Sequence, residues 1–360
     1  MAANTKIEWA THTLNPWRGC TKISAGCQFC YADQLSKRNP STLGIWGPNG
    51  THVVASEAMW KQPVKWNRLA ACCCRKEPAD HEHESGCPQR NRPRVFCASL
   101  ADIFEQWDGP VLTSNGDNWR DLSKGGWGTL DDVRRRLFAL IDATPNLDWL
   151  LLTKRPENIR RMLPAYFPGG YIAEAGSMNR EGARGNLWLG TSFSTQADAD
   201  KNIPELLKCR NLAPVLFVSA EPLLGPVDLS AIPAGIDGKI NWVITGGESG
   251  HHARPMHPDW ARGLRDQCQA AGVPFFFKQW GEYLPIGQQP EPFVRVGKKL
   301  AGRLLDGVEW NEFPRVRTRL PERHGHLCRV LARGRMNSCL IEFGDGWQLV
   351  TSRWYARRVK

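Results

Sequence analysis

The sequence lacks any long apolar run. No stretch approaches the roughly 18–20 consecutive apolar residues that cross a bilayer, and the first thirteen residues are polar where a secretory signal would be apolar. We therefore expect a cytoplasmic protein with no membrane partner, in which thiols stay reduced. Its 12 cysteines are then expected to be metal ligands, catalytic groups or buried thiols rather than disulfides.

Several motifs that would assign a function directly are also missing. There is no G-x-G-x-x-G dinucleotide fingerprint and no G-x-S-x-G nucleophile elbow. The segment Gly297-Lys298-Lys299 lacks the upstream glycine and the following Ser or Thr of a phosphate loop. The motifs therefore favour neither a Rossmann dehydrogenase, nor a P-loop nucleotidase, nor an α/β-hydrolase.

Short apolar runs recur along the chain with helix-sized gaps between them, as strands buried on both faces require. This alternation predicts an α/β fold with a parallel sheet, a partial (β/α) barrel whose polar residues gather at the carboxyl-terminal rim. The runs are 94–99, 148–153, 187–190, 215–219, 241–245 and 274–278. The expected rim residues are Ser99, Asp102, Lys154, Arg155, Thr191, Ser192, Ser219, Glu221, Glu248 and Lys278.

Two regions break the alternation and indicate the domain organisation. A polar Cys/His-rich segment at about 71–93 is predicted to be an insert in a main domain of residues 1–320. Residues 321–360 contain three short strand-like runs and a Gly-Asp-Gly hairpin signal at 344–346. We expect this last segment to be a small SH3-like β module.

Three cysteines near the amino terminus carry the main chemical signal. Cys20, Cys27 and Cys30 have the spacing C-x6-C-x2-C in a loop that contains glycine. Three thiolates can hold a [4Fe–4S] cluster and leave its fourth iron open to a substrate or cofactor. Two alternatives stay open, namely a zinc knuckle completed by His12 or the Cys-rich insert, and thiols without metal.

The ending of this motif resembles that of radical S-adenosylmethionine (AdoMet, SAM) enzymes, because Phe29 precedes Cys30. The chain as a whole is similar to a phage-associated three-Cys-motif family of unknown function, of the phage Gp37/Gp68 type. The matching stretches are 15–32, 95–104, 149–156, 217–229, 242–256, 274–281 and 296–306. The resemblance implies a radical-SAM-like iron–sulfur enzyme that cleaves AdoMet to a 5′-deoxyadenosyl radical and needs an electron donor. Nucleic acid or a nucleotide is a candidate substrate.

Residues that follow three of the predicted strands are candidates to bind AdoMet. The Gly-Gly-Glu element at 246–248 resembles the one that meets the AdoMet amino group in radical-SAM enzymes. The pair at 154–155 could hold the AdoMet carboxylate, and residues 219–221 could touch ribose or substrate. The alternatives are a glycine turn, a helix-start pair and a capping role. The candidates are Gly246, Gly247, Glu248, Lys154, Arg155, Ser219 and Glu221.

The insert has side chains of the kinds that bind zinc, although their spacing matches no standard finger. Zinc is one interpretation of this segment, and a loop with incidental thiols is the other. The residues concerned are Cys72, Cys73, Cys74, His81, His83 and Cys87.

The net charge of +11 is concentrated at the carboxyl terminus. Residues 314–360 contain eleven Arg or Lys and three Asp or Glu, which gives this segment +8. Arginines interleaved with aromatic rings predict contact with nucleic acid, or else a small barrel with a tryptophan core and a solvated surface. They are Arg329, Arg333, Arg335, Arg353, Arg357 and Arg358, with Trp347, Trp354 and Tyr355. A docking site for a protein partner is a further expectation. The rival interpretation of the whole chain is a zinc-stabilised nucleic-acid-binding protein without catalysis.

Overall fold

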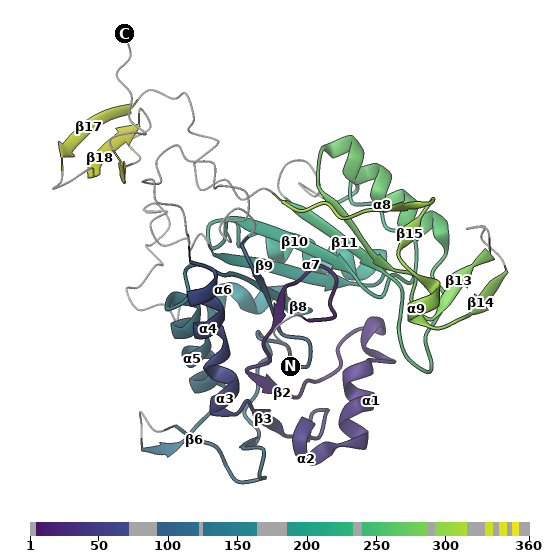
Figure 1. The fold of residues 1–360 in the computed structure, drawn as a ribbon, viewed down its shortest axis with the longest axis horizontal. Helices are drawn as coiled ribbons and strands as arrows, with labels where there is room; N and C mark the ends of the chain where they lie inside the picture. Colours follow the sequence, from purple (N-terminus) through teal and green to yellow (C-terminus); the bar gives the residue numbers. More distant parts are fainter. Residues whose placement is uncertain are drawn as a thin grey trace.

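Seven parallel strands form the central sheet. The computed structural model describes residues 5–71, 92–121, 125–163, 186–232, 240–286, 292–314, 328–333, 338–343 and 348–352. The strand order is β1-β4-β8-β9-β10-β11-β12, every neighbouring pair is parallel, and the sheet curls into a half-barrel (Figure 1). The strands are β1 (His12–Thr13), β4 (Arg94–Cys97), β8 (Asp148–Thr153), β9 (Leu187–Phe193), β10 (Val215–Ala220), β11 (Trp242–Gly246) and β12 (Phe275–Gln279).

All six predicted strands are therefore confirmed, and so is the parallel α/β architecture. The sequence analysis missed β1, because two residues are too short to show an apolar run. The main helices begin where the sequence provides caps. Thr129 and Asp132 form a capping box at the start of α5 (Leu130–Asp142), and the His257 side chain accepts a hydrogen bond from the Asp259 N–H at the start of α8 (Pro258–Ala271).

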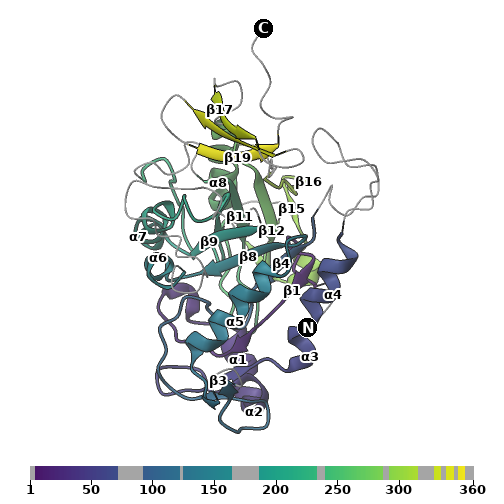
Figure 2. The ribbon, with the colours of Figure 1, turned by 90° about the vertical axis from the view of Figure 1, so that its left-hand side faces the viewer.

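The remaining helices are shorter, and four of them lie within the first 70 residues of the chain. α7 (Gln196–Leu207) packs against β9 and β10, while α8 packs against β11 and β12, as Figure 1 and Figure 2 show. The others are α1 (Tyr31–Arg38), α2 (Pro40–Leu43), α3 (Glu57–Trp60), α4 (Gln62–Leu69), α6 (Ile159–Met162) and α9 (Lys298–Ala301), with the 3-10 turns η1 (Ala25–Cys27) and η2 (Pro156–Asn158). Among the described residues, no helix combines the length and the apolar character needed to cross a membrane.

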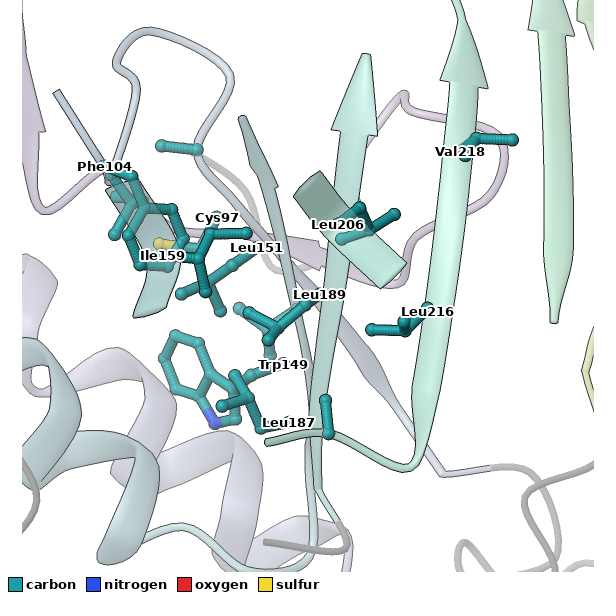
Figure 3. Packing of buried hydrophobic residues seen from close by; sticks show 14 of the residues in the cluster. Cys97, Phe104, Trp149, Leu151, Ile159, Leu187, Leu189, Leu206, Leu216 and Val218 are labelled. Carbon is teal, nitrogen blue, oxygen red and sulfur yellow. The ribbon is translucent and has the colours of Figure 1, made fainter. Parts of the chain in front are cut away.

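Alternate residues along the strands are buried on opposite faces of the sheet. On the helix-covered face, Trp149, Leu151 and Leu189 pack with Leu206 of α7 and Ile159 of α6 (Figure 3). The side chains between them form a second cluster on the other face, which contains no residue from the helices of the described chain. The strands are thus apolar throughout because both of their faces are covered.

This second cluster is mainly aromatic and fills the hollow of the half-barrel. Trp242 is central, with ring centroids 6.1 Å from Trp9, 6.1 Å from Trp188 and 6.0 Å from Phe276. Trp9 also packs on Phe96, with centroids 4.5 Å apart. The hollow of the half-barrel is therefore filled by a packed apolar layer. A cavity on this face of the sheet has room only beyond that layer, at the ends of the strands.

Several small sheets surround the main one. β3 (His52–Val54) pairs antiparallel with β2 (Trp17–Arg18) and parallel with β5 (Val111–Leu112). The two-stranded units are β6 (Arg120–Asp121) with β7 (Gly126–Trp127), β13 (Tyr283–Pro285) with β14 (Phe293–Arg295), and β15 (Leu304–Leu305) with β16 (Val308–Glu309).

The carboxyl-terminal segment contains the three predicted strands. β17 (Cys328–Arg333), β18 (Ser338–Phe343) and β19 (Gln348–Ser352) form an antiparallel sheet. The Cys/His-rich insert at 72–91 lies outside the described residues, and so does the rest of the basic tail. The tail residues concerned are Arg335, Trp347, Arg353, Trp354, Tyr355, Arg357 and Arg358.

Candidate functional site

The carboxyl ends of the parallel strands open into a cavity of about 570 Å³, which we call the rim cavity. Its apolar floor includes Trp9 and Phe96 of the aromatic layer, and its wall includes all three of the thiols Cys20, Cys27 and Cys30. Nine of the ten predicted rim residues line this cavity. The tenth, Thr191, is buried within β9, where its hydroxyl donates to the Thr153 carbonyl at 3.0 Å.

Beside the rim cavity lies a group of buried, hydrogen-bonded ionisable side chains, which we call the anchor cluster: Asp102 and Arg155, which line the cavity, and Glu105 and His52 behind them. Arg155 Nη1 lies 2.9 Å from Asp102 Oδ2, and its Nη2 lies 3.4 Å from Glu105 Oε1. Glu105 Oε2 lies 2.9 Å from His52 Nε2. Asp102 also accepts hydrogen bonds from the Thr153 hydroxyl at 2.6 Å and from the Lys154 N–H at 3.1 Å. These contacts join the ends of β4 and β8 to β3.

The anchor cluster also holds the start of the cysteine loop. Arg155 Nη2 donates to the Thr21 carbonyl at 2.8 Å, and the Thr21 N–H donates to Glu105 Oε1 at 2.8 Å. Arg155 Nη1 lies 3.9 Å from the Sγ of Cys20. Burial, and then the nearby Glu105 and Asp102 carboxylates, raise the pKa of the Cys20 thiol well above its ordinary value. Arg155 therefore positions the loop through contacts that occupy both of its Nη atoms.

Cys27 lies in different surroundings, within the turn η1. Its Sγ is 3.5 Å from the Ser24 hydroxyl. Burial alone would raise the pKa of the Cys27 thiol, but the Lys154 charge and hydrogen bonds from Ile23 and Ser24 outweigh burial and lower it. Lys154 Nζ donates to the Ser192 hydroxyl at 2.7 Å, so β8 and β9 together place this ammonium group in the cavity.

Cys30 is the N-cap residue of α1. Burial raises the pKa of the Cys30 thiol, although hydrogen bonds from the backbone of Asp33 and Ala32 act in the opposite direction. The turn before it is tightly packed, because a Cβ added at Gly26 would lie 2.1 Å from the Ser194 hydroxyl oxygen. Cys27 and Cys30 therefore lie in a short turn that packs against the end of β9 and leads into α1.

The three thiols differ from a site for a single metal ion. Within the described part of the chain, no three His, Cys, Asp or Glu side chains are grouped closely enough to hold a metal ion. A [4Fe–4S] cluster spaces its thiolates around a larger body than a single ion does, and three thiols on one cavity wall are a suitable donor set for it. His12, the alternative zinc ligand, stacks on Trp66 with ring centroids 4.2 Å apart and does not line the rim cavity.

The Gly-Gly-Glu element begins at Gly246, the last residue of β11, and Gly247 and Glu248 line the rim cavity. An added Cβ at Gly247 would lie 2.0 Å from the Trp280 carbonyl oxygen, so packing alone requires this glycine. The Glu248 carboxylate accepts two hydrogen bonds from the Arg254 side chain, both at 2.7 Å. An AdoMet amino group at this carboxylate would have to share it with, or displace, Arg254.

Arg254 also reaches the cysteine loop. Its Nη1 lies 3.3 Å from Gln28 Oε1 and its Nη2 lies 3.3 Å from the Ala25 carbonyl oxygen. Its guanidinium carbon is 5.1 Å from the Phe29 ring centroid. We call the Glu248–Arg254 pair the latch, because it joins the loop after β11 to the turn that carries Cys27.

Two more candidates, Ser219 and Glu221, form a polar chain at the end of β10. The Ser219 hydroxyl donates to Glu221 Oε2 at 2.8 Å, and Lys278 Nζ lies 2.7 Å from Glu221 Oε1. Burial opposes a charge on Lys278, but the Glu221 carboxylate raises the pKa of the Lys278 ammonium group above its ordinary value. Ser219 and Glu221 thus line the same cavity as Lys154. Gly246 packs beside Glu221 but does not line the rim cavity.

The sequence analysis missed Glu105, His52 and Arg254 as parts of the site. Glu105 follows the expected rim residue Asp102 by three positions, which was a usable signal. His52 gave none, because its partner Glu105 lies 53 positions away, and Arg254 was missed although its partner Glu248 is only six positions away.

Fold and site together define a parallel α/β half-barrel protein with a cavity at the carboxyl-terminal rim, where three thiols and polar strand ends meet above an apolar floor. The sequence matches the family described as "Protein of unknown function (DUF5131)" over residues 4–110 and 128–314, and the chain belongs to this family. Comparison with curated proteins and with solved structures found no match.

Proposed function

We propose that the chain is a radical-SAM-like iron–sulfur enzyme and that its half-barrel is a partial (β/α) barrel of the radical-SAM type. The observation that supports this most directly is the shared cavity. Cys20, Cys27 and Cys30 line the same 570 Å³ space as the polar ends of β8, β10 and β11. Such a space suits a cofactor whose polar groups meet the strand ends and whose reactive atom faces the thiols.

In this proposal the three thiolates hold a [4Fe–4S] cluster with one open iron. When bound, the cluster supplies one electron for the reductive cleavage of AdoMet. The chain's own part is to bind and orient. Lys154 offers a positive charge beside Cys27, the Glu221–Lys278 pair offers both signs of charge, and the aromatic floor excludes water from beneath the cavity.

Metal analysis tests the proposal. We expect protein purified without oxygen to contain iron and sulfide, and to convert AdoMet to 5′-deoxyadenosine and methionine once it is reduced. The variant in which all three cysteines are Ala should lose both properties. A matched Cys209→Ala variant should retain them, because Cys209 is buried against α7 and does not line the rim cavity. Zinc without iron in protein handled this way would contradict the proposal and favour the zinc-stabilised alternative.

We further propose that the three-stranded sheet of β17, β18 and β19 belongs to an SH3-like module that contacts nucleic acid. The support is the net charge of +8 in residues 314–360 and the exposed Arg329, which pairs with Glu342 at 2.6 Å. If phosphate contacts dominate, the affinity for RNA or DNA should fall with salt with a log–log slope of roughly −0.7 to −0.9 per phosphate contacted. Removal of residues after Leu320 should flatten the slope, and absence of binding at low salt would overturn this part.

A further inference from the structure

A second pocket, of about 640 Å³, shares none of its lining residues with the rim cavity. It lies between the chain that leads into β5 and the start of α5. We call it the indole pocket, because Trp107, Trp119 and Trp127 all line it. The stretches that match the family end at residue 110 and resume at 128, so β5, β6 and β7 fall outside them. Four of its twelve lining residues, Val111, Asn118, Trp119 and Trp127, thus come from a segment that the family match does not cover, and the other eight come from the matched stretches on either side.

The segment is held by regular backbone hydrogen bonds. β5 pairs with β3, the Trp119 N–H donates to the Val111 carbonyl at 2.8 Å, and the Gly128 N–H donates to the Trp119 carbonyl at 2.9 Å. Glycine makes room for the Trp119 ring, because a Cβ at Gly128 would lie 2.1 Å from it. The fold therefore provides a place for this indole, and the pocket wall is a built structure.

The three rings differ in how they are fixed. Trp107 packs over His52 of the anchor cluster, with ring centroids 4.1 Å apart, and Trp119 packs against the main core. Trp127 is 61% exposed, which is a costly position for the largest aromatic side chain unless something covers it. The pocket thus has two supported walls and one indole that is open to solvent.

The two charged residues that line the indole pocket are both acidic. Asp108 and Asp131 line it, and none of the described residues that line it is Lys, Arg or His. This is unusual on a chain with a net charge of +11. Asp131 pairs with Arg134 of α5, yet its side chain stays 61% exposed. The guanidinium carbon of Arg120, which does not line the pocket, lies 4.7 Å from the Trp127 ring centroid, so this indole already contacts one cation.

From these observations we infer that the indole pocket binds an organic cation, namely a quaternary or methylated ammonium group. Indole faces attract cations more strongly than other aromatic rings do, and the attraction grows when the cation is desolvated. A methylated ammonium group loses less hydration than a bare one and packs its methyl groups on the rings. Asp108 supplies compensating charge, and the exposed side chain of Asp131 adds to it although it also pairs with Arg134. The same chemistry could come from a small quaternary amine or from a methylated lysine on a protein, and these are separate arms of the test.

Binding is measured on the full chain by the shifts of indole N–H signals in nitrogen-labelled protein. The probes are choline, a trimethyl-lysine peptide, and the uncharged choline isostere in which carbon replaces the ammonium nitrogen. We expect a cation to bind roughly tenfold more tightly than the isostere, because only the cation gains the electrostatic attraction of the rings. The arm that binds more tightly identifies the source of the ammonium group.

Two variants separate the ring face from mere apolar area. Trp127→Leu should weaken cation binding roughly tenfold, while Trp127→Phe, which keeps an aromatic face, should weaken it less. Trp260→Leu, at a partly buried indole on α8, should leave binding unchanged. Because Trp127 is mostly exposed, the two changes at Trp127 should leave the thermal unfolding midpoint unchanged. Equal affinity for choline and its isostere, or no response to any cationic probe, would overturn the inference.

Discussion

Cys20 and Cys27 belong to one loop and line one cavity, yet they lie in opposite electrostatic surroundings. Cys20 is beside the buried carboxylates of Asp102 and Glu105, and the pKa of its thiol is raised. Cys27 faces Lys154 and hydrogen-bond donors, and the pKa of its thiol is lowered. The Cys20 end is fixed by the anchor cluster, whereas the Cys27 end is held by a turn and by the latch.

If the three thiols hold a metal cluster as proposed, this difference predicts the order in which they bind it. A thiol must lose its proton to bind a metal, so the group that is already closer to thiolate binds first. Cys27 is that group. Arg155 Nη1 already lies 3.9 Å from the Cys20 Sγ, but burial and the Glu105 and Asp102 carboxylates outweigh its charge, and a metal ion would add further positive charge there. Arg155, which touches Asp102, Glu105 and the Cys20 loop, keeps this end in place meanwhile.

The largest effect is expected from removing a thiol at either end. Cys20→Ala, Cys27→Ala or Cys30→Ala should each abolish the iron–sulfur absorption at roughly 400 nm, because in the proposed cluster each would supply one of three ligands. The matched control is Cys268→Ala, at a buried thiol on α8 that does not line the rim cavity. If one of these three variants keeps the full absorption, the thiol that it lacks is not a ligand. The comparison between Cys20 and Cys27 would then not concern a shared cluster.

The next effect concerns the anchor cluster alone. Arg155→Met leaves Asp102 and Glu105 buried without their cation, and loss of one partner of a buried pair costs about 3–5 kcal/mol in the free energy of unfolding. Urea unfolding of metal-free protein measures this cost. The control is Arg136→Met, which breaks the exposed pair with Glu57 and should cost roughly 0–1 kcal/mol. Equal losses in the two variants would mean that the Cys20 end is not specially fixed.

A smaller effect is expected at the latch. If Glu248 binds the AdoMet ammonium group, Glu248→Ala should weaken AdoMet binding by roughly 1.5–3 kcal/mol, as measured by calorimetry on cluster-loaded protein. Arg254→Met removes the side-chain partner of the Glu248 carboxylate, so the affinity for AdoMet should stay the same or increase. If both variants weaken binding equally while the absorption survives, Glu248 acts through the latch and not through a direct contact.

The sequence predicted the parts of this site that one segment can specify. Strands 148–153 and 215–219 were readable because both faces are buried, and their polar ends therefore had to gather at the rim. What the sequence did not reveal is which side chains pair in space, whether six positions apart, as Arg254 and Glu248 are, or at the ends of two strands, as Arg155 and Asp102 are. Arg254 on Glu248, and Arg155 on Asp102, turn expected cofactor ligands into groups that already have protein partners. No local pattern distinguishes a free carboxylate from a paired one.

The smallest effect tests the electrostatic comparison directly, in metal-free protein. Thiolate is the form that iodoacetamide alkylates, so a thiol with a lowered pKa reacts at lower pH. We expect Cys27 to be alkylated at lower pH than Cys30, and Cys20 to need the highest pH, as followed by mass spectrometry of the labelled peptides.

Lys154→Met removes the charge that favours the Cys27 thiolate, so the pH profile of Cys27 alkylation should move to higher pH. Lys298→Met is the control, because Lys298 also lines the rim cavity but pairs with Glu8 at 3.1 Å and does not contribute to the lowered pKa of Cys27. Alkylation of Cys20 at lower pH than Cys27 would reverse the assignment of the two ends, because the acids of the anchor cluster would then not control the Cys20 thiol.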